Sequence, residues 1–109
     1  MHTVKEDLSL VDPTPHSRTF QAHVAEVNSL GEVQAVVAAL LRVNRIASAT
    51  HNIMAYRIHQ AEKQMFAQDY DDDGEAAAGG RLLMLLQLAD VRNVVVVVSR
   101  WFGGVLLGR

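Results

Sequence analysis

The sequence predicts an α+β domain with the element order βαββαβ, a mixed sheet and helices packed on it. Three observations lead to this prediction: stretches in which apolar and polar residues alternate, as in strands, a stretch with apolar residues three and four apart, as in a helix, and the valine run 94–98. A run of valines without alternation is typical of a strand that is buried on both faces. Helices that follow such strands are expected to cover the sheet.

Residues 1–17 are predicted to form an irregular leader, because Pro13 and Pro15 remove backbone donors and disfavour a helix. The domain proper is expected over 18–109. Its first strand is predicted over 19–27, where apolar and polar residues mostly alternate.

The first helix is predicted to begin at Ser29 and to run to about Val43. Ser29 and Glu32 have the spacing of a capping box, in which each side chain accepts a hydrogen bond from a free backbone N–H at a helix start. The apolar residues that follow form one stripe at helical spacing: Val33, Val36, Val37, Leu40 and Leu41.

A hairpin is predicted next, because residues 52–59 alternate and a short polar break separates them from Met65-Phe66. Within it, one of the side chains of Tyr56 and Arg57 should face the core and the other should face solvent.

A second helix is expected from about Glu75 to Leu88, interrupted by Gly79-Gly80. Each glycine in a helix interior costs roughly 1 kcal/mol relative to alanine. Either the helix begins later, or a neighbouring strand or loop approaches its backbone closely, and we favour close approach.

The valine strand needs a cover on each face, which the apolar residues 105–107 at the end of the chain do not obviously supply. We therefore expect the domain to be incomplete at its C-terminal end, with a C-terminal helix missing, or a partner chain to provide the cover.

Composition limits the possible functions. The chain has 109 residues, of which 50% are hydrophobic, and a formal net charge of -2, so it fits one globular domain with no overall attraction to nucleic acids or membranes. It has no cysteine, which excludes disulfides and cysteine–zinc sites. No segment has the roughly 20 apolar residues of a membrane-spanning helix, so we expect a cytoplasmic protein.

The acidic turn, residues 71–75, is the first candidate site. Its carboxylates are ligands that Mg²⁺ and Ca²⁺ prefer, but its spacing is not that of an EF-hand. Carboxylates at a helix start also cap free N–H groups and interact favourably with the helix dipole. We favour capping and assign no metal.

The second candidate site is the segment 99–104, where the valine strand ends. Arg100 offers a guanidinium, Trp101 and Phe102 offer aromatic faces, and Gly103-Gly104 lets another backbone come near. These groups suit RNA and a protein interface equally. In the alternative interpretation, the aromatic residues close the core and Arg100 pairs with the acidic turn. Under either interpretation we expect the two candidate sites to lie side by side.

His51-Asn52 invites a catalytic interpretation because histidine titrates near neutral pH. However, the sequence has neither a G-x-S-x-G nor an H-E-x-x-H motif. We expect His51 to be a hydrogen-bonded residue at the start of a strand, and we predict no enzymatic activity and no cofactor.

Several separated segments together resemble the Impact family, and look more like its eukaryotic branch than its bacterial one: 47–52, 55–57, 72–75, 78–80 and 99–104. The resemblance implies a fold like that of the second domain of a small-subunit ribosomal protein. It also implies translation control without catalysis, by binding of the ribosome-associated activator of the amino-acid-starvation kinase, which restrains phosphorylation of the initiation factor. Eukaryotic members carry an additional N-terminal RWD domain, which this sequence lacks.

We therefore predict a regulator that binds a protein partner. The alternatives are a domain that binds nucleic acid or the ribosome and, with least support, metal-assisted phosphoryl chemistry at the acidic turn. The predicted partner-binding residues are Arg100, Trp101, Phe102, Gly103, Gly104, Asp72, Asp73, Gly74, Glu75, His51, Asn52, Tyr56 and Arg57.

Overall fold

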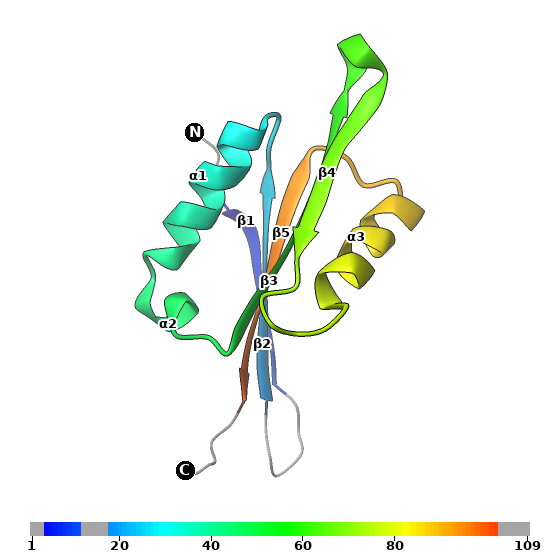
Figure 1. Cartoon of the computed structure of the whole chain (residues 1–109). Coiled ribbons are helices and arrows are strands. Elements are labelled where there is room, and N and C mark those ends of the chain that lie inside the picture. Colours follow the sequence, from blue (N-terminus) through cyan, green and yellow to red (C-terminus); the bar gives the residue numbers. More distant parts are fainter. Residues whose placement is uncertain (1–3, 12–17, 103–109) are drawn as a thin grey trace.

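The computed structural model describes residues 4–11 and 18–102. The elements, in chain order, are β1 (Val4–Val11), β2 (Arg18–Glu26), α1 (Leu30–Leu41), α2 (Asn44–Ala47), β3 (His51–Gln60), the 3-10 turn η1 (Ala61–Lys63), β4 (Met65–Asp71), α3 (Ala78–Leu88) and β5 (Val94–Phe102). The predicted α+β class is confirmed, and β2 to β5 follow the predicted order with the short α2 added (Figure 1). In the described part of the chain, every helix is too short or too polar to cross a membrane.

The strands form one five-stranded sheet in the order β1-β2-β5-β3-β4. Every described pairing in it is antiparallel, so the prediction of a mixed sheet was wrong. The reason is the strand order. β2 and β3 run in the same direction, as do β4 and β5, but in each case another strand lies between the two and no parallel ladder forms.

The leader is not irregular throughout, because β1 occupies Val4–Val11 and pairs with β2. Pro13 and Pro15 lie after this strand, at positions outside the described residues. A proline disrupts the backbone only locally, so the stretch before it remained able to form a strand at the edge of the sheet.

The helices lie on opposite faces of the sheet, with α1 and α2 on one face and α3 on the other (Figure 1). The valine strand serves both sides: Val95 and Val97 belong to the core under α1, and Val96 belongs to the core under α3. The described helices therefore cover both faces of this strand. We predicted a missing C-terminal helix because residues 105–107 did not obviously supply a cover for this strand. That helix was predicted to follow residues 103–109, which lie outside the described residues.

The two helical crossovers differ in hand. α1 connects β2 to β3, and α3 connects β4 to β5. β4 and β5 run in the opposite direction to β2 and β3, and the connection between them crosses the sheet in the opposite direction. Because the two helices also lie on opposite faces, the connections cannot both have the right-handed form that is usual in proteins.

α1 begins as predicted. Ser29 Oγ accepts a hydrogen bond from Glu32 N at 3.1 Å, and Glu32 Oε1 accepts one from Asn28 N at 2.5 Å. The helix ends at Leu41, and Arg42 and Val43 donate the closing backbone hydrogen bonds to the last turn.

α3 begins at Ala78, later than predicted, and a strand also approaches its backbone. A Cβ atom added to Gly79 would lie 2.7 Å from Tyr70 Cδ1 and 2.8 Å from the carbonyl carbon of Asp71. Both explanations of the paired glycines therefore hold: the helix starts late, and the end of β4 packs directly on its first turn.

Candidate functional site

The two candidate sites lie side by side where β3 begins and where β4 and β5 end. Arg100 forms a salt bridge with Glu75, and the two side chains are only 12% and 27% exposed. Asn52 N, at the start of β3, donates a hydrogen bond of 2.6 Å to Asp73 Oδ2. The predicted pairing of Arg100 with the acidic turn is confirmed, and we call this region the sheet end.

Arg100 and Trp101 point to opposite faces of the sheet, because successive side chains of a strand alternate. The Arg100 guanidinium carbon lies 4.8 Å from the ring centroid of Phe20 and 5.0 Å from that of Phe102, on the α3 side. On the other side, Trp101 Nε1 donates a hydrogen bond of 2.9 Å to the carbonyl of Arg45 in α2. The Arg45 guanidinium carbon is 4.4 Å from the Trp101 ring centroid. The end of β5 therefore carries two separate groups on opposite faces of the sheet: Arg100 with Phe20 and Phe102 on the α3 side, and Trp101 with Arg45 on the other.

Each aspartate of the acidic turn accepts a hydrogen bond from a backbone N–H. Asp72 Oδ1 accepts one from Gly79 N at 2.7 Å and so caps the first turn of α3, and Asp71 Oδ1 accepts one from Asp73 N at 2.9 Å. The capping interpretation is confirmed for Asp72. Among the described residues, no group of three or more histidine, aspartate or glutamate side chains is arranged to hold a metal ion, so the cation interpretation gains no support.

His51 is hydrogen bonded at the start of β3, as predicted. Its Nδ1 lies 2.8 Å from the carbonyl oxygen of Asp73, and its ring meets that of Phe102 edge-on with centroids 5.9 Å apart. Gly74 has a φ of 86°, and a Cβ atom there would sit 3.5 Å from His51 Nδ1. Glycine therefore supplies the left-handed backbone that brings the acidic turn onto this histidine.

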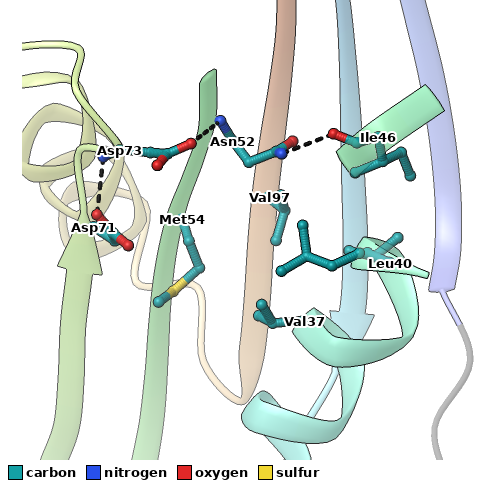
Figure 2. A pocket seen from close by; sticks show the side chains of 9 residues that line it. Val37, Leu40, Ile46, Asn52, Met54, Asp71, Asp73 and Val97 are labelled. Carbon is teal, nitrogen blue, oxygen red and sulfur yellow. Dashed lines mark hydrogen bonds between the residues drawn. The ribbon is translucent and has the colours of Figure 1, made fainter. Parts of the chain in front are cut away.

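A buried polar chain at the sheet end was not predicted. Ser99 Oγ donates a hydrogen bond of 2.6 Å to Asn52 Oδ1 and lies 3.3 Å from His23 Nε2. Asn52 Nδ2 in turn donates one of 2.9 Å to the carbonyl of Ile46 in α2, as Figure 2 shows. His23 and Ser99 are both buried. Their polarity was visible in the sequence, but only the pairing of β3 with β5 places Ser99 opposite Asn52.

Two of the predicted site residues lie elsewhere. Arg57 is six residues along β3 from His51, or about 20 Å at the rise of a strand. It is 8% exposed, and its guanidinium donates to Asp90 Oδ1 at 2.9 Å. Tyr56 is half-buried against the core under α1. The prediction that one of the pair faces solvent was wrong, because Arg57 is buried with hydrogen bonds to Asp90 and Val91, and Tyr56 packs partly against the core under α1. Gly103 and Gly104 lie outside the described residues.

Comparison with known proteins identifies the family. The family model of the Impact N-terminal domain matches residues 16–109. The chain is 58% identical over 95 residues to Protein IMPACT of Rattus norvegicus and 57% identical over 95 residues to Protein IMPACT of Homo sapiens. Each alignment covers 87% of this chain and 30% of the relative, so the chain spans about 30% of the length of these proteins.

Solved structures agree with this assignment. The structure of Yih1, a two-domain translational regulator, matches with a TM-score of 0.72 and 38% identity, over 98% of this chain and 40% of that one. The crystal structure of a hypothetical protein matches with a TM-score of 0.65 over 98% of this chain and 51% of that one, and its 22% identity supports the fold alone. The family model covers nearly the whole sequence, and the chain belongs to the family of the Impact N-terminal domain.

Proposed function

We propose that this chain is a regulatory module of translation control that acts by binding a protein partner and catalyses no reaction. Its family membership supports the proposal, as does its similarity to Yih1, a translational regulator. The proposal places the protein in the cytosol, where translation takes place.

The proposed partner is the ribosome-associated activator of the amino-acid-starvation kinase. An activator molecule that is held by this chain is unavailable to the kinase, and phosphorylation of the initiation factor is restrained. This role requires only a binding surface that competes with the kinase for the activator.

The proposed contact is the sheet-end surface, which we define as Arg45, His51, Trp101 and Phe102. Phe102 carries the proposal, because this large aromatic side chain is 47% exposed and lies next to the His51 ring and the Arg100 guanidinium. Exposed aromatic and arginine side chains are enriched among residues that dominate protein–protein binding. Arg100 and Glu75 hold the surface in place through their salt bridge.

The test is a binding measurement between this chain and the purified activator, with Phe102→Ala as the variant. Truncating a central aromatic contact should weaken binding about tenfold or more. Leu88→Ala is the matched control, because Leu88 is 77% exposed at the far end of α3. Equal binding by wild type and both variants would reject the sheet-end surface as the contact.

A second candidate function is binding to ribosomal RNA, which the exposed Arg45 over the Trp101 ring favours. Salt distinguishes the two functions. Binding that depends on phosphates weakens steeply as salt rises, whereas an aromatic protein contact changes little. A steep salt dependence together with loss of binding after ribonuclease treatment would favour RNA over the protein partner.

A further inference from the structure

A groove runs between α1 and the strand pair β3–β4, on the face of the sheet opposite α3. Its volume is about 550 Å³. Met54 and Tyr56 of β3 form its floor, and Val33, Val37 and Leu41 of α1 line one wall. The core under α1 is built mainly on β2 and β5, and β4, at the edge of the sheet, packs against it through Ala67.

At one end, the groove leads toward a smaller cavity of about 150 Å³ that shares Val37, Leu41 and Met54 with it. Figure 2 shows Met54 and Asp71 on one side of this cavity and Val37 and Leu40 on the other. The hydrogen bonds of Asn52 to Asp73 and to Ile46 span this end. The groove therefore has an open apolar stretch and an end bounded by polar groups.

The two walls differ in charge. The α1 wall is mostly apolar, with Gln34 as a neutral polar lining residue, and α1 carries no basic residue anywhere along its length. The opposite wall is acidic: β4 places Asp69 on the groove and Asp71 on the smaller cavity, because residues two apart on a strand share a face. Asp73 follows from the acidic turn. Such a wall attracts cations and repels phosphate, which argues against a nucleic acid in this groove.

We propose that this groove binds an amphipathic helix of a protein partner, with apolar side chains on the floor and lysine or arginine side chains facing the aspartates of β4. α1 has 12 residues and is about 18 Å long, which matches about three turns of a bound helix. Methionine is adaptable in shape, and Met54 suits a floor that receives apolar side chains from another helix. The site is separate from the sheet-end surface, and the proposal does not depend on the identity of the partner there.

The experiment is an NMR titration of the ¹⁵N-labelled chain with a synthetic helical peptide of about 15 residues. The peptide has leucines at helical spacing on one face and arginines along one flank. A control peptide has glutamates in place of the arginines. The arginine peptide should shift the amide signals of α1, β3 and β4 around the groove, and the glutamate peptide should bind at least about tenfold more weakly.

Matched variants locate the site. Ala38 and Ala35 are both exposed on α1, but only Ala38 lines the groove. Ala38→Arg should weaken binding of the arginine peptide about tenfold, because it fills the groove with a like charge, whereas Ala35→Arg should leave binding within about twofold. Asp69→Lys should also weaken binding, and Glu62→Lys in the exposed turn η1 is its charge-matched control.

Three results would overturn the proposal. The first is no change in the amide signals at a peptide concentration of about 1 mM, because binding that weak would be below the affinity of specific recognition. The second is a set of shifts that map to α3 or to the sheet-end surface. The third is amide signals around the groove that change with the concentration of the chain in the absence of peptide. That result would mean that a second copy of the chain occupies the groove. Phe102→Ala leaves the groove intact, so failure at the sheet end and failure at the groove are distinguishable.

Discussion

Two arginines hold α3 against the sheet, one near each end of the helix. Near its start, Arg100 of β5 pairs with Glu75 and lies over the rings of Phe20 and Phe102. Just after its end, Arg57 of β3 pairs with Asp90 and lies 3.9 Å from the ring centroid of Phe66. The same combination of strand arginine, carboxylate and aromatic ring therefore occurs twice.

The comparison shows that this combination is first a structural device. Arg57 is far from the sheet-end surface, yet it has the same kinds of partner as Arg100. The two pairs differ in the exposure of the carboxylate, since the side chain of Glu75 is 27% exposed and that of Asp90 is 58% exposed. We therefore interpret Arg100 and Glu75 as residues that position the sheet-end surface, and the proposed contact consists of the exposed Arg45 and Phe102 with the half-buried His51 and Trp101.

The largest expected effect comes from removing one carboxylate at a time. Glu75→Gln takes the charge partner from an arginine that is 12% exposed, and should lower the free energy of unfolding by about 3 kcal/mol. Asp90→Asn should cost less, because Asp90 is more solvated and Arg57 keeps its hydrogen bond to the carbonyl of Val91. Urea denaturation measures both. Equal losses would show that burial does not distinguish the two pairs.

A smaller effect tests how tightly α3 packs near Glu75. Gly79→Ala places a Cβ atom against the backbone of Asp71 and should destabilise the chain by about 2 kcal/mol. Gly80→Ala is the matched control, because its Cβ atom would meet Tyr70 at an ordinary 3.6 Å. It should stabilise the helix by up to about 1 kcal/mol. Thermal or urea unfolding that ranks the two variants the other way would contradict the observed packing.

The smallest expected effect is a pH dependence at the other end of α3. A hydrogen bond from Arg92, and to a smaller extent one from Arg57, holds the pKa of Asp90 below its ordinary value of 3.8. A lowered folded-state pKa contributes stability above the ordinary value, and this stability is lost as the pH falls through the folded-state pKa. The difference in unfolding free energy between wild type and Asp90→Asn should therefore shrink as the pH falls below 3.8. A difference that stays constant down to about pH 2 would show that the charge of Asp90 contributes nothing.

Local signals in the sequence predicted much of the fold. The capping box at Ser29, the valine strand and the close approach at Gly79 were all evident from residues near one another in the chain. The strand order was not, because β5 is inserted between β2 and β3 only in the folded state. A mixed sheet was predicted for that reason.

The candidate site shows the same division. The sequence predicted that Arg100 and the acidic turn would meet, since opposite charges at neighbouring element ends favour it. It did not predict that Trp101 turns to the other face and meets Arg45, because α2 is a single short turn with no side-chain cap. It also placed Arg57 at the site, because a motif shows which residues are near in sequence and not how far a strand carries them.

The most direct test of the sheet-end surface is amide hydrogen exchange of this chain, alone and mixed with the purified activator that we propose as its partner. We predict slower exchange on binding at residues 43–52 and 99–102, which surround Arg45, His51, Trp101 and Phe102, and unchanged exchange in the hairpin around η1. Protection that is confined to that hairpin or to the C-terminal half of α3, with none at the sheet end, would contradict the account.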